Sequence, residues 1–179
     1  MDFNSYPNIA ALADILGGTK QTTFNKKRYA RAEESWNRLG PDELAYINGA
    51  APTAVRILDC YVTPYYILHM DMRAFFVIPV RDAIWMYTSV VTNRMNFIPY
   101  NKEHTLFLVD RAGEAHALGM KNTGGFSKKT PCEDAMNQMV QIIAPQRKGM
   151  LVGWSEQISA AIQNNFAGVV QSVDANSAQ

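Results

Sequence analysis

The spacing of apolar side chains changes twice along this chain. Up to about residue 50 they recur every three or four positions, which predicts amphipathic helices over residues 7–16, 26–39 and 41–48. Beyond Arg56 the apolar residues are mainly Val, Ile, Tyr and Phe in short runs bounded by turn residues, and such runs predict strands. Helical spacing returns at Thr130. The order of these patterns predicts an α+β fold.

The predicted strands occupy the middle of the chain, and the longest runs are FFVIPVRDAIWMYTSVVT (75–92) and LFLVDRAGEAHALGM (106–120). Residues 92–94 between these runs read as a loop, and 96–100 as a further short strand. Gly113 can take the left-handed conformation of a bulged hairpin turn, which would place Leu108 opposite His116 and Leu106 opposite Leu118. Both faces of this hairpin are apolar, so we expect both to be covered. The strands are predicted at residues 56–61, 65–70, 75–80, 83–91, 105–109 and 114–120.

The segment after Thr130 carries helix signals. Thr130 and Glu133 have the spacing of a capping box, and Pro131 suits a first helical turn. Met136, Met139, Val140 and Ile143 form one apolar stripe, and the helix should end before Pro145. A short strand at 150–154 and a helix capped by Ser155 are expected next, followed by a frayed tail after Ser172.

A helical leader, several antiparallel strands and a capped helix occur in this order, and the order resembles the pleckstrin-homology-like (PH-like) split barrel. The segments YYIL (65–68), FVIP (76–79), DAIWMY (82–87) and LGMKN (118–122) are similar to an uncharacterised bacterial family with a PH-like barrel. The resemblance covers about residues 56–145 and implies a barrel with its C-terminal capping helix there. The helical leader expected at 1–55 and the β-α extension expected at 146–179, packed on the same domain, depart from a simple PH-like barrel. It implies no phosphoinositide-binding residues.

The number and positions of the charged residues limit the kinds of partner expected for this chain. Lys and Arg number 17 and Asp and Glu 16, giving a formal net charge of +1, so a nucleic-acid partner is not expected. Arg81 and Asp82 interrupt the most apolar run, and no run of about 18 apolar residues predicts a transmembrane segment. The middle of the chain is mildly basic, with 9 basic and 6 acidic residues between 56 and 130.

The leading functional hypothesis is a non-catalytic binding or scaffolding domain for a protein, a peptide or a membrane surface. Its candidate partner-binding residues are the basic side chains expected in loops, with ordinary solvated charge as the alternative. These residues are Arg94, Lys102, Lys121, Lys128 and Lys129. Association with a second copy is a further alternative, through strand edges or aromatic residues such as Trp36, Tyr61, Tyr65 and Tyr100.

The alternative is a small hydrolase- or transferase-like enzyme using Cys132 or a histidine. Cys132 would lie in the first turn of a helix, where the dipole lowers a thiol pKa. His69 and His104 are expected at strand ends and His116 within a strand. The chain contains no GxSxG, HExxH, P-loop or GxGxxG motif, and we predict no catalytic residue, metal or cofactor. Cys60 and Cys132 are expected to be buried free thiols, with a disulfide between them as the alternative. Free thiols favour the cytoplasm, either for the chain itself or for the cytoplasmic part of a longer or membrane-associated protein.

Overall fold

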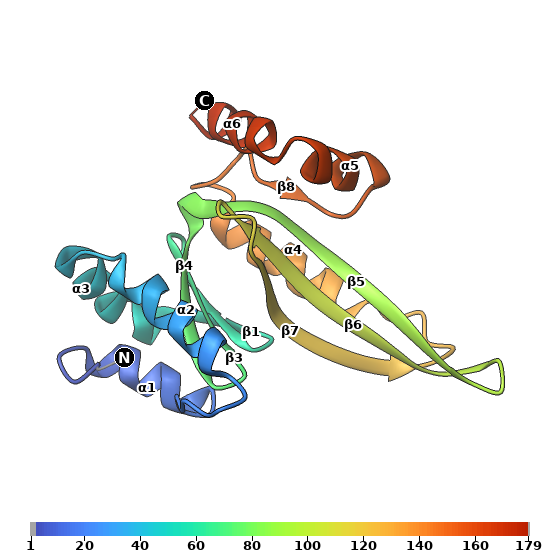
Figure 1. Cartoon of the computed structure of the whole chain (residues 1–179), viewed down its shortest axis with the longest axis horizontal. Helices are drawn as coiled ribbons and strands as arrows, with labels where there is room; N and C mark the ends of the chain where they lie inside the picture. The colour runs from blue at the N-terminus through green and yellow to red at the C-terminus, as the bar shows by residue number, and fades with distance from the viewer. Residues whose placement is uncertain (1–2, 179) are drawn as a thin grey trace. The chain divides into compact units, whose positions relative to one another are not determined.

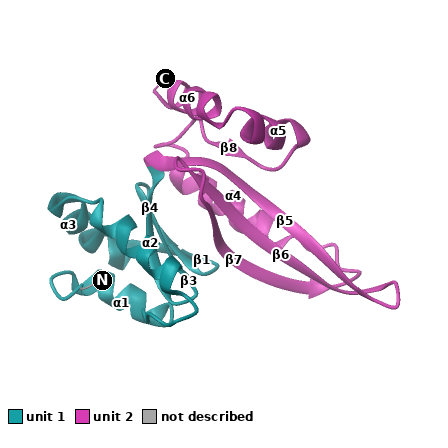
Figure 2. Ribbon diagram, in the orientation of Figure 1, with its two compact units in different colours: residues 1–80 teal, residues 81–179 magenta. Residues whose placement is uncertain are grey.

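The computed structural model describes residues 3–178, and the chain divides into two compact units, residues 1–80 and 81–179 (Figure 2). The boundary between the units lies inside the range 56–145 that the sequence assigns to one domain. The domain ranges 1–55, 56–145 and 146–179 stay predictions. The chain is of the α+β class, as expected, with two sheets in which most neighbouring strands are antiparallel.

Unit 1 contains three helices followed by a four-stranded antiparallel meander in the order β1-β2-β3-β4. The predicted helices are confirmed, whereas the single strand expected at 56–61 is two short strands. Leu58 has a positive φ of 53°, so the chain reverses at that point. The elements are α1 (Pro7–Ile15), α2 (Lys26–Asn37), α3 (Pro41–Ala50), a 3₁₀ turn (Ala51–Thr53), β1 (Val55–Ile57), β2 (Cys60–Val62), β3 (Tyr66–Asp71) and β4 (Ala74–Pro79).

The core of unit 1 forms where α2 packs on β4. The rings of Trp36 and Phe75 lie 5.3 Å apart, and the Trp36 Nε1–H donates to the Phe75 carbonyl at 2.7 Å. This bond satisfies the polar end of a buried indole, as buried tryptophan requires. Arg28, on the same helix, forms an ion pair with Asp71 of β3.

Unit 2 is built on a sheet in the order β7-β6-β5-β8, in which β8 runs parallel to β5 (Figure 1). Residues 92–94, expected as a loop, belong to β5, which continues to Met95. A 3₁₀ turn (Val80–Asp82) precedes the sheet. The elements are β5 (Ala83–Met95), β6 (Ile98–Asp110), β7 (Ala115–Gly124), α4 (Pro131–Ile143), β8 (Leu151–Val152), α5 (Glu156–Asn164) and α6 (Phe166–Ser177).

Helix α4 packs on β5, β6 and β7, and it buries Met136, Met139 and Ile143 of the predicted stripe, whereas Val140 is half-buried. The predicted capping box is wrong, because the Thr130 side chain makes no capping bond in the structure. The cap at Ser155 is confirmed: its Oγ accepts the N–H of Ile158 at 3.1 Å.

The hairpin register is confirmed near the turn and wrong further out. Leu108 pairs with His116, but Leu106 pairs with Gly119 because an irregularity in the ladder adds one residue to β7. The frayed tail is also wrong, since α6 continues to Ser177. Within residues 3–178 neither sheet closes into a barrel, and no helix is both long enough and apolar enough to cross a membrane.

Candidate functional site: an exposed β-arm

Two strands of unit 2 extend well beyond the helix that covers them. The half of β5 nearest its start is buried, from Ala83 to Met86, whereas the half beyond Ser89 is largely exposed. Figure 1 shows β5 and β6 projecting as a long ribbon, with the end of β7 alongside. We call residues 90–104 and 119–129 the β-arm. A ribbon that outgrows its hydrophobic cover is stable only through its attachment to the rest of the sheet.

The β-arm ends in a two-residue turn. Met95 pairs with Ile98, and the two residues between them, Asn96 and Phe97, have positive φ values of 50° and 67°. Positive φ at both central residues suits the right-handed twist of the strands, and Asn-Gly is the sequence that usually supplies it. Phe97 stands where glycine is favoured, at a cost of roughly 1–2 kcal/mol.

Packing of the Phe97 side chain does not offset this strain, because 95% of its surface is exposed. A large apolar side chain at a strained position, facing water, is an outlier that points to a functional hypothesis. The neighbouring Met95 and Ile98 are also exposed, at 67% and 60%. We call residues 95–98 the tip of the arm.

A loop after β7 supports the tip from one side. The Gly125 N–H donates to the Tyr100 carbonyl at 3.1 Å, and a Cβ at Gly125 would lie 2.1 Å from the Pro99 carbonyl oxygen. Only glycine allows this approach. The contact holds the next residue, Phe126, beside the start of β6, with 77% of its surface exposed.

The β-arm concentrates exposed apolar surface. Scattered apolar residues are normal on any protein, but a contiguous group marks an interaction surface. The large apolar side chains exposed on the arm are Val90, Val91, Met95, Phe97, Ile98, Tyr100, Met120 and Phe126.

All five basic residues singled out from the sequence lie on the β-arm. The expectation that they are loop residues is wrong for Arg94 (β5), Lys102 (β6) and Lys121 (β7), because these strands are longer than predicted. Lys128 and Lys129 lie between β7 and α4, as expected. Glu103 is the one acidic residue of the arm, so five positive charges and one negative charge give it a net charge of +4.

The five basic residues differ in their surroundings. Lys102 is half-buried, and its Nζ donates to the Ser127 carbonyl at 2.8 Å, so it also fastens the supporting loop. Arg94, Lys121, Lys128 and Lys129 are exposed. The tip cannot be recognised in the sequence, because the pair Asn96-Phe97 is a poor match to the usual hairpin turn sequences.

Among the residues considered for catalysis, Cys60 and His69 face each other across the β2–β3 ladder, and both are fully buried. Both cysteines are free and buried, as predicted. The Cys132 thiol donates to the His104 carbonyl at 3.2 Å, and the His104 ring bonds the Thr123 hydroxyl at 2.9 Å. His104 lies within β6 rather than at a strand end. Burial raises the pKa of Cys60 well above its usual range, which favours the unreactive thiol.

A carboxylate cluster lies at the opposite end of β6 from the tip. Ligand atoms of Asp110, Glu114 and His116 all lie within 4.8 Å of one another. Burial alone would raise the pKa of Asp110, but hydrogen bonds from His116 and the Glu114 and Ala112 N–H groups outweigh it and the pKa is lowered. Asp110 Oδ1 accepts both N–H groups at 2.9 Å, which is the bonding of an Asp-headed turn. The cluster is therefore explained by the turn itself.

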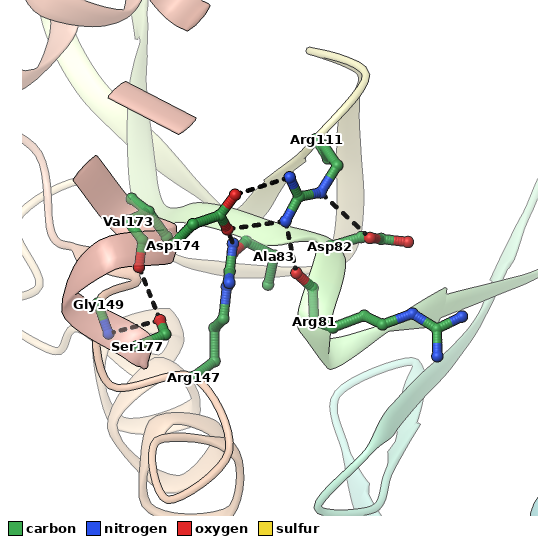
Figure 3. Close-up of polar contacts among 9 residues, drawn as sticks. All are labelled: Arg81, Asp82, Ala83, Arg111, Arg147, Gly149, Val173, Asp174 and Ser177. Carbon is green, nitrogen blue, oxygen red and sulfur yellow. Dashed lines mark hydrogen bonds and ion pairs between the residues drawn. The ribbon is translucent and has the colours of Figure 1, made fainter. Parts of the chain in front are cut away.

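A second polar cluster docks α6 onto the base of the sheet (Figure 3). Arg111 holds Asp174 through two bonds of 2.9 and 2.7 Å, and the buried Arg147 holds the same carboxylate at 2.8 Å. The hydrogen bond from Arg111, together with the Arg147 bond and both positive charges, lowers the pKa of Asp174 to about 2. Arg147 also donates to the Ala83 carbonyl, which ties α6 to the start of β5. Ion pairs and hydrogen bonds thus hold a helix against this end of the sheet, whereas the described contacts near the tip are those of the loop after β7.

In comparisons with known proteins, no family model, curated protein or solved structure matches the chain.

Proposed function

We propose that this chain is a non-catalytic binding module and that the β-arm of unit 2 is its binding surface. The observation that carries the proposal is Phe97, an aromatic residue almost fully exposed in a strained turn. Transfer of such a side chain out of water is favourable by about 1.5–3 kcal/mol, so a partner that covers the tip gains a free energy comparable to the strain.

Three classes of partner remain from the sequence: a protein, a peptide or a membrane surface, with a second copy as a special case. The apolar tip suits all of them, and the net charge of +4 on the arm favours an acidic one. The resemblance to PH-like domains is part of the same proposal. It is supported by the order of antiparallel strands followed by a helix, α4, that packs on them.

An enzyme using Cys132 or a histidine is the weaker candidate. The Cys132 thiol is buried and donates a hydrogen bond to a backbone carbonyl, an environment that favours the neutral thiol over the nucleophilic thiolate. The partner of the His104 ring is the hydroxyl of Thr123.

Density-gradient sedimentation of lysates from cells that make the protein tests the proposal. The wild-type chain should migrate with a larger particle or a membrane fraction, and Phe97→Ser should return it to the position of the free 20.0 kDa chain. Phe24→Ser is the matched control, because Phe24 in unit 1 is 92% exposed. Free migration of the wild type, or equal effects of both substitutions, would reject the β-arm as a binding surface.

A further inference from the structure

We infer that the partner of the β-arm is the surface of an anionic phospholipid bilayer, which the tip enters from the headgroup side. This inference rests on the proposed function, because it names the partner of the same surface. It is carried by the order in which apolar and basic side chains follow one another along the arm.

The tip residues Met95, Phe97 and Ile98 lie at the extreme end of the arm with basic side chains directly behind them, whereas Val90, Val91 and Met120 lie further back, near His104. Arg94 precedes the tip by one residue, Lys102 faces Thr92 and Thr123 across the ladder, and Lys121 pairs with His104. At about 3.3 Å per residue, the basic side chains begin beside the tip and continue for roughly 20 Å. A bilayer presents the same order with depth, since the anionic phosphates lie outside the apolar boundary.

The aromatic residues of the arm suit the boundary between headgroups and acyl chains. Tyr100 is 59% exposed and lies three residues from Phe97, a place where its hydroxyl can stay in water while its ring contacts lipid. Phe126 is held beside it by the contact of Gly125 with Pro99 and Tyr100. Phe97 and Phe126 thus present two aromatic side chains from separate segments at one end of the arm.

The composition of the arm favours lipid over a protein partner. Protein interfaces are enriched in Trp, Tyr, Phe, Met and Arg and depleted in Lys. The arm carries four lysines and one arginine, so its basic residues are of the kind that protein interfaces lack. Lysine on a polar surface beside exposed Phe is the composition of segments that lie in membrane interfaces.

The same composition disfavours nucleic acid. Single-strand binders line a basic groove with several aromatic rings on which successive bases stack. Here the exposed rings are accompanied at the tip by Met95 and Ile98, which offer no flat face for stacking. The net charge of the whole chain, +1, also lacks the usual basic excess.

Vesicle co-sedimentation of the full chain is the direct test. We expect binding to phosphatidylcholine vesicles containing about one third phosphatidylserine, and at least about tenfold weaker binding to phosphatidylcholine alone, because each basic residue near an anionic surface contributes. Phe97→Ser should weaken binding by about tenfold, the effect of removing one inserted aromatic side chain. Phe24→Ser should leave binding unchanged.

A charge-reversal pair tests the basic residues separately. Lys121→Glu with Lys129→Glu should weaken binding to anionic vesicles by more than about tenfold and make it less sensitive to salt. Lys26→Glu with Lys27→Glu, on exposed positions of α2, is the matched control and should change binding by less than about twofold. Equal effects of the two pairs would contradict a lipid-facing arm.

Insertion of the tip can be followed at a single position. Cys60 and Cys132 are 0% and 1% exposed, so a thiol-reactive, polarity-sensitive dye should label a cysteine introduced by Phe97→Cys. Its emission should shift to the blue on anionic vesicles, and the same dye at Phe24→Cys should not shift.

The outcomes separate this inference from the proposed function. Gradient migration that depends on Phe97, without vesicle binding, would overturn the lipid partner and leave the arm as a surface for a protein. A pellet that forms equally without vesicles would show self-association instead. Vesicle binding unaffected by Phe97→Ser would overturn the role of the arm.

Discussion

Two hairpin turns of this chain have the same backbone strain and opposite surroundings. Met72 and Arg73, between β3 and β4, have φ values of 47° and 64°; Asn96 and Phe97, at the tip, have 50° and 67°. In both turns residues with side chains occupy the left-handed region, which glycine would occupy without strain. The difference lies in what holds each turn.

The turn in unit 1 is fastened by the segment that precedes α2. The Asn25 side-chain amide donates to the Met72 carbonyl at 2.6 Å, and the Lys20 N–H donates to the Arg73 carbonyl at 3.1 Å. Arg73 in turn donates to the Gly17 carbonyl at 3.1 Å. These bonds offset the strain, so a structural role accounts for the turn.

The strain at the tip is not explained in this way. The loop after β7 contacts Pro99 and Tyr100, next to the tip, and the Phe97 side chain is exposed to water. In the Met72-Arg73 turn, hydrogen bonds from the rest of unit 1 offset the backbone strain, so the stability of the fold explains the turn. At Phe97 the strain is not offset by packing of the side chain, and binding of a partner to that side chain explains it better. The comparison therefore supports a functional role for the tip and a structural role for the other turn.

The largest stability effect is expected at the fastened turn. Asn25→Ala removes an amide that is 3% exposed and bonds the carbonyls of both Met72 and Lys20. Leaving these groups unsatisfied should destabilise the chain by about 2–4 kcal/mol, measured as the free energy of unfolding in urea. Asn101→Ala in the β-arm is the control and should change it by less than about 0.5 kcal/mol. A small effect of Asn25→Ala would mean that the turn in unit 1 is not fastened as described.

A smaller, pH-dependent effect is expected at the anchored base of unit 2. Asp174→Asn should destabilise the chain by roughly 1–2 kcal/mol near neutral pH, because it removes the negative charge that pairs with both the solvent-accessible Arg111 and the buried Arg147. Because the pKa of Asp174 is lowered to about 2 in the folded state from 3.8, its contribution is fully present above about pH 5 and is lost as pH falls towards 2. Asp82, 3.4 Å from Arg111, belongs to the same group of charges. Urea unfolding at several pH values should show the gap between the two proteins closing in acid, and a constant gap would contradict this assignment.

The smallest stability effects should come from relieving the strained turns themselves. Phe97→Gly should stabilise the chain by about 0.5–1 kcal/mol, because glycine adopts positive φ freely and no packing is lost. Met72→Gly, at a side chain that is 60% exposed, should act in the same direction and by a similar amount. Thermal unfolding of both variants checks this, and destabilisation by Phe97→Gly would show that the aromatic side chain supports the fold after all.

Much of the fold could be predicted from the sequence because local signals agree with it. Helical spacing located α1, α2 and α4, and the Ser155 cap located the start of α5. The register of the β6–β7 hairpin is predicted correctly at His116, where the Asp110 turn determines it, and wrongly from Leu106 outward. The signal for the extra residue in β7 is Gly119, because a glycine within a strand often marks a bulge.

The candidate site was predicted only in part. The five basic residues were chosen for their charge, and the structure places all of them on the β-arm. The continuation of β5 and β6 through polar residues such as Asn93 and Asn101 could not be read from the pattern, because strands without a buried face lack the alternation that identifies them. For the same reason the tip was not recognised as a turn, and Phe97 was not singled out.

One measurement tests the central claim most directly: the partition of Phe97→Gly and Met72→Gly onto anionic vesicles, compared with wild type. Both variants relieve a strained turn, but only one removes an exposed aromatic side chain from the tip. We predict that Phe97→Gly folds at least as stably as wild type and binds about tenfold more weakly, while Met72→Gly binds as wild type does. Wild-type binding by Phe97→Gly would contradict the account, since the strain at the tip would then have no function.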